Sequence, residues 1–304
     1  MHQRADLAPR VPSPHRAFSP RRLAAITANT VTELTRLKVF YVLLIFALVL
    51  IGNSVFMARL TFQQEFQVLK DVSLGAMSIF TALLAIIATA RLLPQDIEDR
   101  TVYTILAKPV PRFEYVAGKL FGVLVLLAIS VIVMTALFFV VLYLREQSAL
   151  AEATAQMSAF PPEQLADALR TVRASTFSPN LLPGIAAIYL KGCVLAGLTL
   201  FISTFATTNI FTLVVTAFVY FIGHLQATAR EIWLQEQGGT WLGRTFLAGV
   251  ALVFPDLQQF DFADEIIAST AIPLALFLKT IALGCFYILL YLLLSIAVFT
   301  GKEL

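Results

Sequence analysis

Long apolar stretches alternate with short polar connections along most of the chain. A helix that crosses the hydrocarbon core of a bilayer needs about 20 mostly apolar residues. Six windows of the sequence reach or approach that length, so we predict an all-α, polytopic membrane protein with six transmembrane helices. The predicted spans are residues 39–58, 72–93, 120–144, 183–205, 209–225 and 274–299.

Two weaker patterns lie in the second half of the chain. The fifth window is the shortest, and the residues from Ala206 to Asn209 supply a turn and a helix cap before it. We therefore predict that the fourth and fifth spans form a helical hairpin. The apolar stretch from Trp241 to Phe254 contains Arg244 and several glycines, which favours an interfacial or re-entrant segment over a crossing.

Polar segments at the start and in the middle of the chain indicate further helices. Residues 1–20 carry prolines among arginines and are typical of a disordered tail, which leaves 21–304 as one membrane domain. From Arg22 to Lys38, apolar residues recur near helical spacing and predict an amphipathic helix at the membrane surface. The loop 145–182 is predicted to hold two helical pieces, through Glu146 to Met157 and after Pro161.

Composition and charge agree with a membrane protein. Hydrophobic residues make up 59% of the 304, and only 13% are charged, too few to cover a water-soluble particle of this size. The net charge of +3 forms no continuous basic face, so we expect no nucleic-acid partner. With the N-terminus inside, 13 Lys and Arg residues lie in inner segments and seven in outer ones, which predicts that both termini are cytoplasmic.

Chemistry-bearing motifs are sparse. No Asp or Glu falls within a predicted span, which argues against a stand-alone carrier driven by protons or sodium. The sequence has no hydrolase motif, no metal-ligand spacing and no GxxxxGK[ST] loop for ATP, and its two cysteines lie in apolar stretches. We therefore predict that the chain is not itself an enzyme and holds neither a metal nor a cofactor.

One lysine is placed deep in a predicted span. Lys191 lies about 12 Å into the fourth span, too far from its end for the ammonium to reach the interface easily. It is predicted either to line a polar cavity and contact a substrate or anionic lipid, or to be a packing lysine satisfied by carbonyl groups. Lys279 lies five residues into the last span, so its side chain can extend back to the outer interface.

The connection between the second and third spans is the most organised charged segment. Residues 94–119 read PQDIEDRTVYTILAKPVPRFEYVAGK. Pro94 is predicted to end the second span, and the acids that follow favour a short helix to about Ala107. Pro109 and Pro111 then stiffen a turn. Such an element suits docking to a soluble partner, although a solvated connecting loop is consistent with the same charges.

Residues 98–119 resemble the signature of the ATP-binding cassette (ABC) type-2 permease family, which lies between the second and third spans. The matching positions are Glu98, Thr101, Leu106, Pro109, Arg112, Gly118 and Lys119. The resemblance implies that 94–119 holds a coupling helix that sits in a groove of a separate cytoplasmic ATPase subunit. The residues it assigns to that coupling are Glu98, Asp99, Arg100, Thr101, Leu106, Pro109, Arg112 and Glu114.

The same resemblance implies an exporter in the bacterial inner membrane. ATP and Mg²⁺ would bind the partner subunit, and a second permease subunit, identical or related, would complete the unit. Gly118 and Gly122 form a small-xxx-small pair and are predicted helix-packing positions. An alternative is a membrane-embedded assembly or scaffold factor that uses the same ATPase coupling to act on an outer-face protein through loop 145–182.

Overall fold

The computed structural model describes residues 18–59, 65–98, 111–156, 161–206, 208–235, 254–267, 270 and 272–301, with side chains except at 57–59 and 227–235. Within these residues the regular secondary structure is helical, without a strand. Six of the helices are long and apolar enough to cross a membrane. The chain is therefore a multi-pass membrane protein by the length and composition of its helices.

Each predicted span falls within one of these six helices, which confirms the number and the order of the predicted crossings. The six are α2 (Lys38–Arg59), α3 (Glu65–Glu98), α5 (Arg112–Gln156), α7 (Leu181–Phe205), α8 (Asn209–Gln235) and α11 (Leu274–Gly301). The shorter helices are α1 (Pro20–Thr35), α6 (Pro162–Thr176), η1 (Leu257–Phe260) and α10 (Ala263–Ile267).

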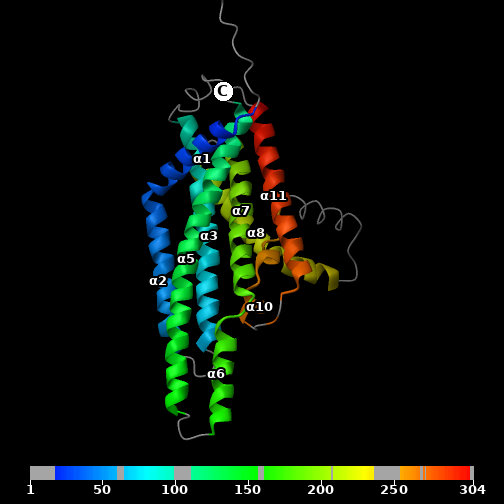
Figure 1. Ribbon diagram of the computed structural model, residues 1–304. Helices are drawn as coiled ribbons and strands as arrows, with labels where there is room; N and C mark the ends of the chain where they lie inside the picture. Colours follow the sequence, from blue (N-terminus) through cyan, green and yellow to red (C-terminus); the bar gives the residue numbers. More distant parts are fainter. Residues whose placement is uncertain are drawn as a thin grey trace, which may run out of the picture.

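Helix α7 lies at the centre of the bundle and is buried along most of its length (Figure 1). Its most extensive contacts are with α3 and α11. Small residues allow this close approach, because a Cβ added at Gly192 would lie 2.6 Å from Thr81 Cγ2 of α3. A Cβ added at Gly284 of α11 would similarly lie 2.5 Å from Leu190 Cγ. Helix α7 is thus the central element on which α3 and α11 pack.

Two predicted helix ends are wrong. Pro94 does not end the second span, because α3 continues through it to Glu98. The residues that follow Pro94 are held by tertiary contacts of Asp96, described below, which offset the hydrogen bond that proline cannot donate. The third span does not end at Leu144 either: the residues from Glu146 are helical, as predicted, but they continue α5 without a break to Gln156. No glycine or proline lies between Val123 and Gln156 to interrupt it.

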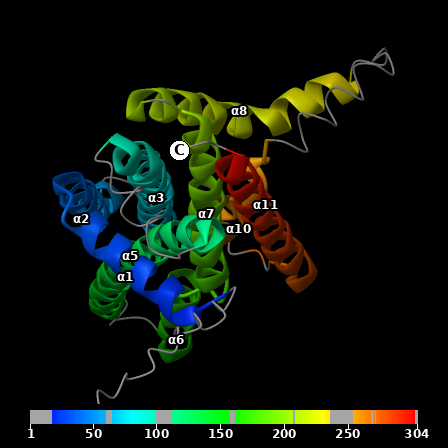
Figure 2. The same cartoon turned by 90° about the horizontal axis from the view of Figure 1, so that it is seen from above.

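The predicted hairpin of the fourth and fifth spans is also wrong in its geometry. The chain does turn between Phe205 and Asn209. Helix α8 then runs obliquely away from α7 and crosses the edge of the bundle (Figure 2). Its contacts are shared between α7, α3 and η1, and many of its large apolar side chains are exposed.

The two ends of the bundle differ. Helix α1 and the last turn of α11 lie at one end, and α6 lies at the other (Figure 1). Helix α6 begins at Pro162, as the sequence indicated. Most of the predicted disordered tail and of the Trp241–Phe254 stretch lies outside the described residues. The side of the membrane that each end faces stays a prediction.

Candidate functional site

The 99–111 connection joins the end of α3 to the start of α5. Both of these helix ends lie at the end of the bundle that carries α1 (Figure 1). Glu98 is the last residue of α3 and is exposed, and Arg112 is the first of α5. Five of the residues implied in coupling lie outside the described residues: Asp99, Arg100, Thr101, Leu106 and Pro109. What the structure describes is therefore how the connection is anchored at its two ends.

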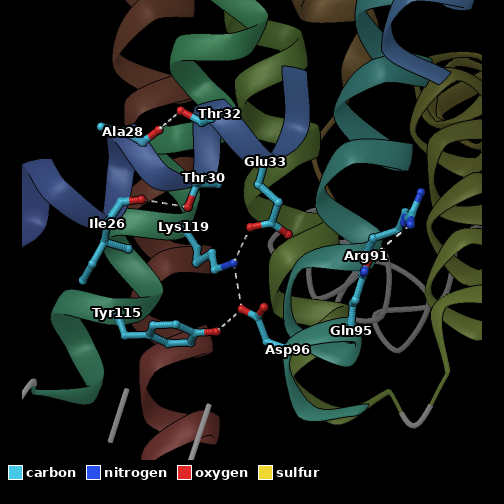
Figure 3. A network of polar contacts seen from close by, with 10 residues as sticks. All are labelled: Ile26, Ala28, Thr30, Thr32, Glu33, Arg91, Gln95, Asp96, Tyr115 and Lys119. Carbon is cyan, nitrogen blue, oxygen red and sulfur yellow. Dashed lines mark hydrogen bonds and ion pairs between the residues drawn. The ribbon is translucent and has the colours of Figure 1, made fainter. Parts of the chain in front are cut away.

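One anchor is a buried polar network between α1, α3 and α5 (Figure 3). The Lys119 ammonium lies 2.7 Å from Asp96 Oδ2 and 3.1 Å from Glu33 Oε2. The Tyr115 hydroxyl donates a second hydrogen bond to Asp96 Oδ2. Lys119 and Tyr115 are almost wholly buried, so the contacts between α3 and α5 lie away from water, whereas the Glu33 side chain of α1 is 35% exposed.

A second anchor ties the first turn of α5 to the start of α1. The Glu114 carboxylate accepts hydrogen bonds from Arg22 Nε at 2.7 Å, from Arg22 Nη2 at 2.8 Å and from the Ser19 backbone N–H at 2.7 Å. The Glu114 side chain is fully buried. The hydrogen bond with Glu114 raises the pKa of the Arg22 guanidinium, and the hydrogen bond from Arg22 lowers the pKa of the Glu114 carboxyl. In this arrangement Glu114 holds α1 instead of facing outward.

These two anchors together form what we call the loop-base junction. It consists of Arg22, Glu33, Asp96, Glu114, Tyr115 and Lys119. Sequence reasoning singled out Glu114 and Lys119, but it did not connect them to α1 or to Asp96. The partners lie 19 to 95 residues apart along the chain, so no local spacing could have paired them.

Arg112 extends the anchoring to the last helix. Its Nη1 donates to the carbonyl oxygens of Phe299 at 3.3 Å and Thr300 at 2.9 Å. These are among the last carbonyls of α11, which have no partner within their own helix. A cation at this position also complements the negative end of the helix dipole. The connection is thereby linked to α11 as well as to α1, α3 and α5.

Gly118 and Gly122 let α1 lie directly on α5. A Cβ added at Gly118 would lie 2.7 Å from Ile26 Cγ2, and one added at Gly122 would lie 2.5 Å from Thr30 Cβ. Thr27 Oγ1 also donates to the Gly118 carbonyl at 3.3 Å. Both predicted packing positions therefore face α1, and any larger side chain there would push the two helices apart.

Lys191 is buried far from this junction. Its Nζ lies 3.3 Å from Ser78 Oγ and 3.8 Å from Asp261 Oδ2. Both partners are side chains that line a cavity, whereas the packing alternative expected carbonyl partners. Within the described part of the chain, no group of three His, Cys, Asp or Glu residues is arranged to hold a metal ion.

Comparison with known proteins adds no identification: no protein-family model matches the chain, and a search of curated proteins finds no match to it.

Proposed function

We propose that this chain is the membrane-spanning subunit of an ATP-driven ABC exporter, coupled through residues 94–119 to a separate ATPase subunit. The observation that carries the proposal is the residue pattern from Glu98 to Lys119, placed between the second and third of six membrane-crossing helices. ATP and Mg²⁺ bind the partner subunit in this proposal, so the chain itself carries no nucleotide site and no catalytic residue.

The loop-base junction supports the proposal physically. A partner that moves the 99–111 connection moves the ends of α3 and α5, to which the connection is covalently joined. The ion pairs of Lys119 with Glu33 and of Glu114 with Arg22 carry that displacement to α1, and Arg112 carries it to α11. Because these pairs are largely buried and close-packed, a push on the connection displaces whole helices instead of being absorbed by mobile side chains.

The arrangement in the membrane follows from the same proposal. The end that carries α1 and the loop-base junction faces the cytoplasm of a bacterial cell, and both termini lie there. A second permease subunit, identical or related, supplies the other half of the path, since six helices enclose little space alone. Nucleotide-driven closure of two ATPase subunits then shifts the membrane domains between two states of access.

A second candidate function is an assembly or scaffold factor that uses the same coupling to act on an outer-face protein. The length of α5 favours it. At 45 residues α5 is about 68 Å long, far more than the roughly 30 Å hydrocarbon core requires. Helix α6 packs on this extension and presents mostly exposed residues, among them Arg170 and Asp167. A projecting helical pair of this kind is a suitable surface for a protein.

The test is purification of the chain from native membranes, followed by assay of ATP hydrolysis. We expect a nucleotide-hydrolysing subunit to co-purify, and Glu98→Ala or Arg100→Ala to lower the hydrolysis that this chain stimulates while membrane insertion is unchanged. Glu163→Ala is the matched control, because Glu163 is an exposed acid on α6 at the opposite end. A stable, active six-span protein without such a subunit would contradict the proposal.

Reconstitution of the complex separates the two candidates. Movement of a lipid-like or drug-like solute that depends on ATP supports the exporter. Hydrolysis without movement of any tested solute, together with an outer-face protein whose binding is lost when α6 is deleted, supports the scaffold.

A further inference from the structure

A cavity of about 490 Å³ lies between α3, α7 and the η1–α10 segment. Its size falls within the range of small-molecule sites. One face of α3 forms its longest wall, with Asp71, Leu74, Gly75 and Ser78 following each other at helical spacing. The opposite wall comes from Gly184 and Ile188 of α7, and η1–α10 closes the remaining side.

Two glycines shape the cavity. Gly75 leaves space open beside α3, and Gly184 lets α10 lie close to α7. A Cβ added at Gly75 would meet nothing within 4 Å, so this position of α3 faces empty space. At Gly184 an added Cβ would collide with Ile266 of α10, which shows that α10 is seated tightly on α7. The cavity is thus a space between well-packed walls, not a loose contact between helices.

The charges around the cavity are mainly negative. Asp71, Asp261 and Asp264 line it, and each is exposed at its surface. One of them, Asp261, pairs with Lys191, a buried lysine that also contacts Ser78. Its ammonium is 3.8 Å from Asp261 Oδ2, beyond hydrogen-bonding distance. Three carboxylates against one lysine leave the cavity with a net negative charge.

The remaining lining is mixed, and a second hollow adjoins it. Leu74, Ile188, Phe262 and Ile266 contribute apolar groups to the wall, and Ser78 and Gln258 contribute polar ones. Asp261 and Phe262 also line a second hollow of about 320 Å³, whose lining includes one further acid, Glu265, and one lysine, Lys279. That hollow adds no net positive charge to the first one.

We propose that the cavity between α3, α7 and η1–α10 binds an organic cation with a compact apolar body. An ammonium group fits the acidic mouth at Asp71, Asp261 and Asp264, and the apolar body fits against Phe262 and Ile188. The Lys191 ammonium competes with the ligand for Asp261. If the chain is an exporter, this site names the class of its cargo; the binding claim itself does not depend on the ATPase partner.

The test measures binding of benzyltrimethylammonium to the full chain in lipid nanodiscs by equilibrium dialysis, without ATP or a partner. Benzenesulfonate, of similar size and opposite charge, is the matched probe. We expect saturable binding of the cation alone, and Asp71→Asn or Asp261→Asn to weaken it about tenfold, because a charged partner is lost. Asp167→Asn, which removes an exposed acid from α6, leaves binding unchanged.

Two further variants test the position of the site. Gly75→Leu fills the cavity and abolishes binding, whereas Gly52→Leu, at another glycine with open space around its Cβ position, does not. Lys191→Met removes the competing ammonium and tightens cation binding. Binding of benzenesulfonate that Lys191→Met abolishes, or absence of saturable binding of either probe, would overturn the proposal.

An ammonium group is carried both by free organic cations and by the ethanolamine headgroup of a phospholipid. Nanodiscs of phosphatidylglycerol alone, compared with discs that also contain phosphatidylethanolamine, separate these sources. A lipid source predicts that phosphatidylethanolamine weakens probe binding to the parent chain, and a free cation predicts no change. Absence of cation binding in the nanodiscs would contradict only the proposed cavity site. Absence of an ATPase subunit in native membranes would contradict only the proposed function.

Discussion

The Lys119 ammonium joins three helices of the loop-base junction, because it forms ion pairs with Glu33 of α1 and Asp96 of α3 from its own position on α5. It is almost fully buried between two carboxylates, and one of them, Asp96, also accepts the Tyr115 hydroxyl. Removing such charges from water is costly, and their mutual attraction offsets the cost only while every partner is present. The network therefore favours the observed relative position of α1, α3 and α5, because a shift of any one helix would separate buried charges from their partners.

Substitution of Lys119 tests this dependence. Lys119→Met keeps the length of the side chain but removes the ammonium group that lies 2.7 Å from the buried Asp96 carboxylate. We expect the free energy of unfolding, measured in detergent, to fall by about 3 kcal/mol. The double variant with Asp96→Asn should recover part of this loss, because the amide carries no charge to stabilise. Additive losses in the double-mutant cycle would contradict a coupled pair.

Glu114 makes a related prediction at the start of α1. Glu114→Gln preserves the shape of the side chain but removes the charge that Arg22 and the Ser19 N–H contact. We expect backbone amides in the first turns of α1 to exchange hydrogen about tenfold faster. Glu163→Gln, an exposed substitution on α6, serves as the control. Equal protection of α1 in the two variants would show that Glu114 does not hold it.

At the scale of whole helices, hydropathy predicted which segments cross and tertiary contacts decided where they end. Spans are predictable because apolar length is required to cross lipid, whatever the neighbouring helices do. Helix ends are not predictable in the same way. Helix α3 continues past Pro94, where Asp96 is held by its contacts with α5. The obliquity of α8 was equally hidden, since the Ala206–Asn209 turn fixes the break but not the direction of the helix that follows.

The packing of α1 on α5 gives a prediction at this scale. Gly122→Ala places a methyl group 2.5 Å from Thr30 Cβ, so α1 must shift. We expect a loss of about 1–3 kcal/mol in the stability of α1 docking, measured by hydrogen exchange. Gly52→Ala, whose Cβ would meet nothing within 4 Å, should be neutral or slightly stabilising in its helix. If the two alanines behave alike, close packing at Gly122 is not what positions α1.

At the scale of the whole molecule, an even number of crossings places α1 and the end of α11 together and α6 opposite (Figure 1). The sequence predicted this through the count of spans, and the side that the distribution of Lys and Arg assigns to each end stays a prediction. It did not predict the loop-base junction, because the acids and bases that form it come from three helices and show no common spacing. The cavity beside Lys191 was anticipated only as one of two alternatives.

Labelling from outside the cell tests the orientation. In a Cys285→Ser background, which removes the exposed native thiol, we expect an impermeant maleimide to label Ala166→Cys of α6 nearly completely in intact cells. Ala28→Cys of α1, also exposed in the structure, should label only after the membrane is permeabilised. Labelling of both cysteines in intact cells would place the two ends on the same side, and labelling of Ala28→Cys alone would reverse the assignment.

The central claim is that the 99–111 connection transmits work from a nucleotide-hydrolysing subunit, and contact in native membranes tests it most directly. A photo-crosslinking amino acid at Thr101 or Leu106 would be activated in membranes whose ATPases have been labelled with radioactive azido-ATP. We predict one adduct that carries both this chain and the nucleotide label, with none from the same probe at Ala166. Adducts with lipid alone, or with no nucleotide-labelled protein, would contradict the claim.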